Sequence, residues 1–335
     1  LTRWFDYNDT FLAKEWAHPS DNFGSIYSYF YLNPNYKFID FTTALTKAYE
    51  IQGSLCLGTS LNQLGYDHVF YVKLASGAVF SSLLSKGNEK IIHRTINHIL
   101  LDGPSLRSYR HFPNVGKRKS WAAADASKRG IELAKISQLN DEVYSSIQND
   151  KNWGFEKNYL NDSEIKFGKE LNDWVIQNVL FKVLFPAEFH GQSAVEGAIK
   201  LSKEFNQNID KVKKINIFTH EPAIRIIANK ENLSNASDRD HSLEYMVSAA
   251  LLFGELKYEM YGNDFSGLNK IESLRKKIVV SEDTDFTKNY YEFSKRHISN
   301  SIEIVYDNNS TSEKITIENP IGHPSRREEA IPLLK

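Results

Sequence analysis

Three side chains suited to proton transfer stand close together near the start of the chain: Asp6, Thr10 and His18. A carboxylate, a hydroxyl and an imidazole could form the polar wall of a pocket and exchange protons with a bound ligand. Asp and Thr are also the residue types that cap helix N-termini. The spacing alone therefore leaves a catalytic and a structural interpretation open.

A second imidazole, that of His68, ends the sequence Gly65-Tyr66-Asp67-His68. It stands directly before an apolar stretch. His68 is a further candidate for general acid–base work because the pKa of an imidazole lies near neutrality. The alternative is a histidine that caps or flanks a buried helix.

Cations gather between residues 107 and 119, in front of the Ala-rich stretch 120–137. Arg107 and Arg110 could bind carboxylates in bidentate fashion, and Lys119 could supply a compact point charge. Backbone N–H groups at a helix N-terminus would add to such a site. The charge run alone favours an ordinary solvated basic loop, and a site for a ligand that carries several carboxylates is the alternative.

Lys182 stands in the apolar run 180–190, where burial of its charge is costly unless it is paired. It is either a functional cation or one partner of an interdomain salt bridge. His241 and Tyr245 are four residues apart, so a helix would place both on one face. The aspartates before His241 could instead be helix caps.

Cys56 is the only cysteine of the chain. An iron–sulfur cluster needs several cysteine ligands, and one chain of this sequence cannot supply them. We therefore expect no iron–sulfur cluster. We also expect no other cofactor and no metal, so that side-chain acids and bases carry the chemistry.

Composition indicates a soluble enzyme that binds a small molecule. The 335 residues are 41% hydrophobic, which is enough for a sizeable core, and the net charge of −1 predicts neither nucleic acid nor an anionic membrane as partner. No apolar run is long enough to span a membrane. A single free cysteine suits a reducing compartment.

Hydrophobic periodicity predicts helices first and a mixed region afterwards, with a boundary near residue 178. The patterns favour helices at 42–57, 68–85, 120–137, 193–205 and 241–256. Alternation favours strands at 214–220, 301–306 and 314–318, of which the last two form a hairpin. Before residue 177 no convincing strand is predicted.

From about Asp6 to its end the sequence resembles the MmgE/PrpD family. The resemblance is carried by six motifs, at residues 6–22, 65–68, 102–126, 180–190, 237–245 and 319–329. It implies a fold that is mainly α with an α+β part: a large helical domain (1–177), a smaller α+β domain (178–320), and a return to the helical domain (321–335). The active site would lie in the cleft between the domains. We expect the chain to be an internal part of a longer enzyme, truncated at both ends.

Within the family, residues 49–53, 185–190 and 238–241 are similar to those of the methylcitrate dehydratases. The implied reaction is elimination of water from 2-methylcitrate to give 2-methyl-cis-aconitate in the methylcitrate cycle of propionate degradation. The resemblance implies six catalytic residues: Asp6, Thr10, His18, His68, Lys119 and Lys182. It implies four substrate-binding residues: Arg107, Arg110, His241 and Tyr245.

In this reaction a base removes a C–H proton beside a carboxylate, and an acid protonates the departing hydroxyl. His18 and His68 are the acid–base candidates, and the lysines would hold carboxylates or donate protons. The sequence does not say which group is the acid and which the base.

Two alternatives stay open. A decarboxylase of cis-aconitate would use the same residues. A drifted paralogue or fragment without catalysis is suggested by Ala124, where the family has Gly, and by Pro104, where the dehydratases have Gln. We further expect a homodimer, in the mitochondrial matrix of a eukaryote or otherwise in the cytoplasm.

Overall fold

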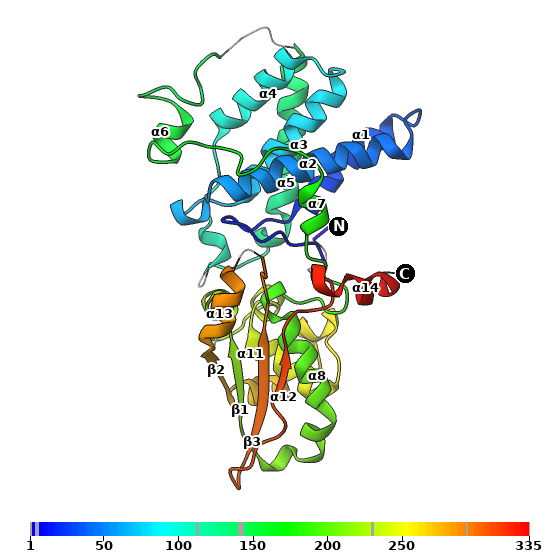
Figure 1. The fold of residues 1–335 in the computed structure, drawn as a ribbon, viewed down its shortest axis with the longest axis vertical. Helices are drawn as coiled ribbons and strands as arrows, with labels where there is room; N and C mark the ends of the chain where they lie inside the picture. The colour runs from blue at the N-terminus through cyan, green and yellow to red at the C-terminus, as the bar shows by residue number, and fades with distance from the viewer. Residues whose placement is uncertain are drawn as a thin grey trace. The chain divides into compact units, whose positions relative to one another are not determined.

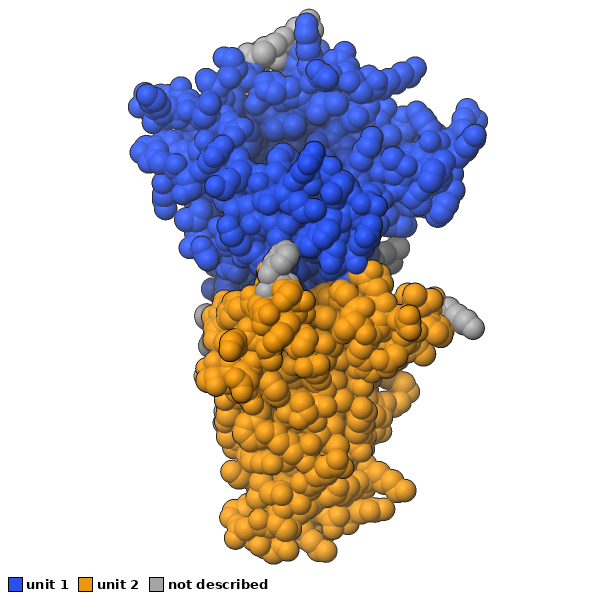
Figure 2. All heavy atoms as spheres, in the orientation of Figure 1, with its two compact units in different colours: residues 1–4, 8–179 blue, residues 5–7, 180–335 orange. Residues whose placement is uncertain are grey.

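The computed structural model describes residues 2–3, 7–111, 114–139, 144–228, 231–292 and 294–334. The chain divides into two compact units, blue and orange in Figure 2: unit 1 comprises residues 1–4 and 8–179, and unit 2 comprises residues 5–7 and 180–335. Figure 1 shows unit 1 as helical and a small sheet in unit 2. The expected fold class, mainly α with an α+β part, is thereby confirmed. None of the helices in the described ranges is both long and apolar enough to cross a membrane.

Unit 1 is built from five longer helices and two short ones within the described residues. The helices are α1 (Phe23–Leu32), α2 (Phe38–Gly58), α3 (Val69–Leu84), α4 (Glu89–Asp102), α5 (Arg118–Leu139), α6 (Phe155–Tyr159) and α7 (Trp174–Asn178). Two short 3-10 turns matter for the site: η2 (Pro19–Asn22) and η4 (Ser108–Arg110). The predicted helices at 42–57, 68–85 and 120–137 correspond to α2, α3 and α5.

Helix α3 lies at the centre of unit 1, in contact with α2, α4 and α5. Nearly every residue of its first three turns is buried, as expected for a helix that is apolar on all faces. It approaches α5 so closely that a Cβ at Gly130 would lie 2.8 Å from the carbonyl oxygen of Lys73. Glycine at this crossing therefore allows the two helices to pack with their first turns at the same end.

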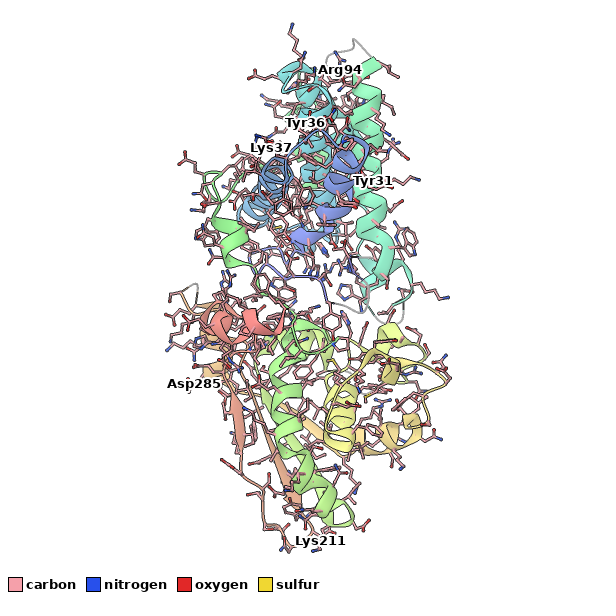
Figure 3. All side chains as sticks on the ribbon, turned by 90° about the vertical axis from the view of Figure 1, so that its right-hand side faces the viewer. Tyr31, Tyr36, Lys37, Arg94, Lys211 and Asp285 are labelled. Carbon is pink, nitrogen blue, oxygen red and sulfur yellow. The ribbon has the colours of Figure 1, made fainter. Side chains whose placement is uncertain are left out.

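Helix α1 is rich in aromatic residues and was not predicted as a helix. Phe23 and Tyr27, four residues apart, stack with ring centroids 5.6 Å apart, and Tyr27 lies 6.0 Å from the next ring along the helix, Tyr31. Figure 3 labels Tyr31 on α1 and Tyr36 in the turn that follows it. The Tyr36 hydroxyl lies 3.1 Å from that of Tyr29, which ties the turn back to the helix.

Unit 2 contains a four-stranded sheet with strand order β2-β1-β3-β4. The strands are β1 (Val212–Thr219), β2 (Ile278–Glu282), β3 (Asn300–Tyr306) and β4 (Ile315–Ile317). Strand β1 pairs parallel with β2 and antiparallel with β3, and β3 and β4 form the predicted antiparallel hairpin. Strand β2 was not predicted.

Two helices supply many of the buried apolar side chains in the hydrophobic core of unit 2, which includes one face of this sheet. Buried side chains of α8 (Gln192–Gln207) and α11 (Leu243–Phe253) join inward-facing isoleucines of β1 and β3 in one hydrophobic core. The remaining helices of unit 2 are α9 (Glu221–Ile227), α10 (Ala236–Arg239), α12 (Leu268–Arg275), α13 (Thr284–Tyr291) and α14 (Arg327–Ala330).

Residues 321–334 belong to unit 2, and the predicted return of residues 321–335 to the helical domain stays a prediction. The Phe181 amide donates to the Gly322 carbonyl oxygen at 3.0 Å. The Arg326 guanidinium pairs with Glu196 of α8 at 2.8 Å. These contacts hold the segment against the beginning of its own unit.

Candidate active site

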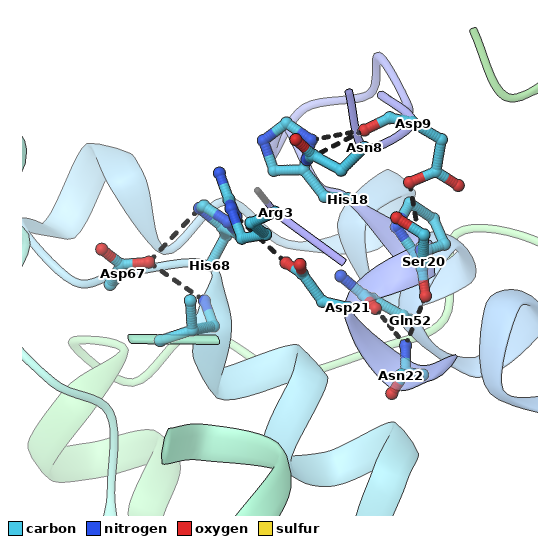
Figure 4. A network of polar contacts seen from close by, with 12 residues as sticks. Arg3, Asn8, Asp9, His18, Ser20, Asp21, Asn22, Gln52, Asp67 and His68 are labelled. Atoms are coloured by element: carbon cyan, nitrogen blue, oxygen red, sulfur yellow. Dashed lines mark hydrogen bonds and ion pairs between the residues drawn. The ribbon is translucent and has the colours of Figure 1, made fainter. Parts of the chain in front are cut away.

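The candidate site in unit 1 is a polar network around His18 and His68, the two imidazoles predicted for acid–base work. Figure 4 shows both histidines among carboxylates, amides and the Arg3 guanidinium. His18 occupies the N-cap position of η2, and His68 occupies that of α3. Each imidazole is thus fixed to the beginning of a helical segment rather than to a loop tip.

The segment that carries His18 folds back on itself. Phe11 and Ala17 exchange backbone hydrogen bonds of 2.8 and 3.2 Å, and both side chains are buried. This closure brings the Asp9 carbonyl oxygen to 2.5 Å from Nδ1 of His18. A carbonyl can only accept, so Nδ1 of His18 carries a proton.

His68 is held through a second short backbone pairing. Tyr66 bridges Leu106, and the Asp67 amide donates to the Ser105 carbonyl oxygen at 2.9 Å. The loop before η4 is thereby pinned to the beginning of α3. The pairing places the Asp67 carboxylate beside Nδ1 of His68, at 3.3 Å.

The two imidazoles lie next to each other although 50 residues separate them in the sequence. Their ring centroids are 5.5 Å apart with an interplanar angle of 67°. A base and an acid at this spacing could serve neighbouring atoms of one substrate.

Buried carboxyl groups complete the network. The Asp9 side chain accepts from the Ser20 amide at 3.0 Å, and burial raises its pKa to about 6. Asp21 pairs with Arg3 at 3.1 Å, yet burial still raises its pKa. We did not single out Asp9 or Asp21 from the sequence, although both stand in the same motif as His18.

Several buried polar atoms of this region have no hydrogen-bond partner within the described part of the chain. They are Oδ1 of Asn8, Oγ1 of Thr10, Oδ1 of Asp21 and Nε2 of His68. Buried polar groups are normally paired, so such a group of atoms indicates room for water or for a polar ligand. Thr10, a predicted catalytic residue, belongs to it. Asp6, which stands in the same motif as Thr10 and His18, lies outside the described residues.

Lys119 is the second residue of α5 and is buried. Val69 of α3 packs against Ala122 and Ala123 of α5. His68 directly precedes Val69, and Lys119 precedes this contact by about one turn. Both side chains therefore belong to the same end of the α3–α5 pair, as a shared site requires.

The two predicted substrate-binding arginines have protein partners. Arg110 binds Asp67 in bidentate fashion, Nε to Oδ2 at 2.5 Å and Nη2 to Oδ1 at 3.3 Å. The guanidinium is thus engaged by a carboxylate of the protein itself, and its assignment to the substrate stays a prediction. Arg107 donates from Nε to Nε2 of His111 at 3.1 Å, and burial lowers its pKa.

Two predicted residues of unit 2, Lys182 and His241, lie near a carboxylate that the sequence did not reveal as a site residue. Glu188 is placed by the 3-10 turn η5 (Phe189–Gly191), whose N-cap it forms. Burial alone would raise its pKa, but His190, His241 and Lys182 together lower it. The His190 ring extends this cluster from its Nε2 to the Tyr290 hydroxyl at 3.0 Å. Lys182, a predicted catalytic residue, is buried.

His241 and Tyr245 do not share a helix face as predicted. Helix α11 begins at Leu243 after the cap Ser242, which leaves His241 in the preceding turn, where it pairs with Asp240 at 2.7 Å. Tyr245 is fully buried in the core of unit 2, and its hydroxyl donates to the Met260 carbonyl oxygen at 2.5 Å. Its side chain thus packs in the core, and its assignment to the substrate stays a prediction.

Cys56 lies buried in α2, and burial raises the pKa of its thiol well above the usual value. It is therefore a neutral core side chain. Across the described residues, no group of three or more His, Cys, Asp and Glu side chains is arranged to hold a metal ion.

Two family models match the chain. The model of the MmgE/PrpD N-terminal domain matches residues 1–168, and that of the MmgE/PrpD C-terminal domain matches residues 185–335. Together they account for nearly the whole sequence.

Curated relatives align with the complete chain. 2-Methylcitrate dehydratase of Escherichia coli (strain K12) is 40% identical, with 71% of the relative covered. The mitochondrial 2-methylcitrate dehydratase of Yarrowia lipolytica is also 40% identical, with 66% covered. The probable 2-methylcitrate dehydratase of Saccharomyces cerevisiae is 40% identical, with 68% covered.

Proposed function

Because the chain belongs to the MmgE/PrpD family, we propose that it is a hydro-lyase that converts 2-methylcitrate to 2-methyl-cis-aconitate and water. Identity of 40% to 2-methylcitrate dehydratases over the whole chain supports this substrate. The product belongs to the methylcitrate cycle of propionate degradation.

The observation that carries the proposal is the pair of neighbouring imidazoles, His18 and His68, in a network with unpartnered polar atoms. Elimination needs one group to take the proton from the carbon next to a carboxylate and another to protonate the leaving hydroxyl. The C–H and C–O bonds break, a C=C bond forms, and the proton and hydroxyl leave as water. Two imidazoles in contact can supply both functions.

The substrate's carboxylates need cations. Lys119 is the candidate in unit 1, because it lies at the end of α5 nearest His68. Lys182 of unit 2 stays a predicted carboxylate-binding or proton-donating residue. Arg107 stays a predicted substrate-binding residue. We propose that the Thr10 hydroxyl donates a hydrogen bond to the bound substrate.

We propose that the chain performs this step without an iron–sulfur cluster of its own. The sole cysteine is a buried, neutral thiol in α2. A cluster ligand must be a thiolate, which burial disfavours at this position.

The experiment is direct. Purified protein is mixed with 2-methylcitrate, and the absorbance of the conjugated product is followed. The same samples are assayed for carbon dioxide with cis-aconitate as substrate. Turnover of 2-methylcitrate without carbon dioxide supports the dehydratase, whereas carbon dioxide release identifies a decarboxylase. Absence of both reactions would identify a non-catalytic relative.

A homodimer and an intracellular location, mitochondrial or cytoplasmic, also stay proposals. The Yarrowia lipolytica relative is named as mitochondrial, whereas the relatives from bacteria carry no compartment in their names. Light scattering of the purified protein tests the dimer, and fractionation of the source cells tests the compartment.

A further inference from the structure

Asp67 forms the closest ionic contacts of His68. Its Oδ1 lies 3.3 Å from Nδ1 of His68 and accepts the Val69 amide at 3.1 Å. Its Oδ2 accepts from Nε of Arg110. The carboxylate is therefore bound on both oxygens and cannot rotate without losing a contact.

This arrangement decides which nitrogen of His68 carries the proton. Burial would raise the pKa of Asp67, but His68 and Arg110 lower it below its usual range, so the carboxylate is ionised and can only accept. An ionised carboxylate 3.3 Å from Nδ1 of His68 favours the proton on that nitrogen. The remaining nitrogen, Nε2, is buried and has no hydrogen-bond partner in the described ranges of the chain.

The groups that face His68 come from four segments. Besides Asp67 these are Arg3, Arg107, Arg110 and the His18 ring. Burial lowers the pKa of His68 well below its usual value, and the three arginines lower it further, against the opposing charge of Asp67. The imidazole is neutral at pH 7, with its lone pair on Nε2.

We propose that Asp67, clamped by Arg110, is the positioning residue that fixes His68 as an Nδ1–H tautomer and makes Nε2 the base of the elimination. This assignment rests on the proposed function, which supplies the substrate. It assigns the base to His68 and the acid to His18. His68 takes the proton from carbon. His18 is left to protonate the departing hydroxyl.

The competing interpretation is a salt bridge that only fastens the loop before η4 to α3. The chain offers a matched control for it: Arg129 binds Asp102 with nearly the same bidentate geometry, at 2.7 and 3.3 Å, outside the imidazole network. The control pair is more exposed, with side chains 43% and 28% accessible, so the comparison concerns the pH profile: a pair that only fastens the fold should leave that profile unchanged.

The experiment combines kinetics with NMR. Asp67→Asn removes the negative charge and should lower kcat/KM by about 10²-fold or more, within the usual range for a general base. It should also move the acidic limb of the pH profile, which the pKa of the base sets, to lower pH, whereas Arg110→Gln should move it to higher pH. Asp102→Asn and Arg129→Gln should leave the profile unchanged. Circular dichroism of every variant excludes loss of fold as the cause.

The side-chain ¹⁵N spectrum of the wild-type protein supplies a readout that does not depend on activity. The signals of His68 are assigned by their loss in His68→Gln. Protonated Nδ1 and unprotonated Nε2 support the proposal, and an Nε2–H tautomer overturns it. Identical pH profiles for Asp67→Asn and Asp102→Asn would overturn it as well. If 2-methylcitrate is not turned over, the proposed function fails, while the spectrum still decides the tautomer.

Discussion

The His18 and His68 rings lie side by side, with centroids 5.5 Å apart. Nδ1 of His18 donates to the Asp9 carbonyl oxygen, whereas Nδ1 of His68 lies 3.3 Å from the Asp67 carboxylate. The two acceptors differ in charge, so the two imidazoles differ in the proton chemistry that they can perform. This difference allows one to act as the acid and the other as the base.

Replacement of His18 tests its part in the reaction. His18→Gln keeps a hydrogen-bonding side chain but cannot exchange a proton at neutral pH, so kcat should fall by about 10²–10⁴-fold. KM should change less, because the cations remain. The matched control is His93→Gln, which changes an exposed histidine of α4. Steady-state kinetics that show near-normal kcat and an unchanged pH profile for His18→Gln would make His18 a positioning residue.

Replacement of Lys119 tests carboxylate binding. Lys119→Met keeps much of the apolar stem and removes the charge, so one charge-assisted contact worth about 1.5–3 kcal/mol should be lost. We expect kcat/KM to fall by roughly 10- to 150-fold, with the larger part in KM. Lys128→Met on the same helix is the control, since the Lys128 side chain is 75% exposed. Equal kinetics of the two variants would remove Lys119 from the site.

The stability of the protein should fall as pH rises towards neutrality, because of Glu15. This side chain is fully buried and accepts from the Asn62 amide at 2.6 Å, and burial raises its pKa to about 7 from 4.5. The folded protein binds the proton more tightly than the unfolded chain does. The resulting stabilisation is present below about pH 4.5 and is lost as pH rises through about 7.

Glu15→Gln removes this titration and keeps an acceptor oxygen. Between pH 5 and pH 8 the free energy of unfolding of the wild type should therefore drop by about 2–3 kcal/mol more than that of the variant. Urea unfolding at both pH values measures this difference. Parallel pH dependences of the two proteins would show that Glu15 titrates normally.

Removal of the thiol or of iron should leave catalysis intact. Cys56→Ala changes one buried atom in α2, and a strong iron chelator removes any adventitious metal. We expect unchanged kcat in both cases, because side chains perform the proton transfers. Loss of turnover on chelation, restored by reconstitution with iron and sulfide, would contradict cluster-free dehydration.

Sequence periodicity predicted the elements that are strongly patterned. Helices α2, α3, α5, α8 and α11 and strands β1, β3 and β4 all correspond to predicted segments. Helix α1 was not predicted because its aromatic residues have modest helix propensity. Stacked rings four residues apart stabilise it instead. Strand β2 is five residues long with an irregular burial pattern, so alternation does not reveal it.

The site shows a different limit of sequence reasoning. Residue types identified His18 and His68 separately, but only the backbone pairing of residues 66 and 106 reveals what surrounds His68. Arg110 was assigned to the substrate because a guanidinium fits any carboxylate. The sequence alone does not show that the carboxylate is that of Asp67.

The absorbance assay with 2-methylcitrate, run on the wild type and on His68→Gln, tests the central claim most directly. The account predicts conversion to 2-methyl-cis-aconitate by the wild type and a rate lower by about 10²–10⁴-fold for the variant, because the base is lost. Equal rates for the two proteins would contradict the imidazole mechanism. Absence of turnover by the wild type would contradict the proposed function itself.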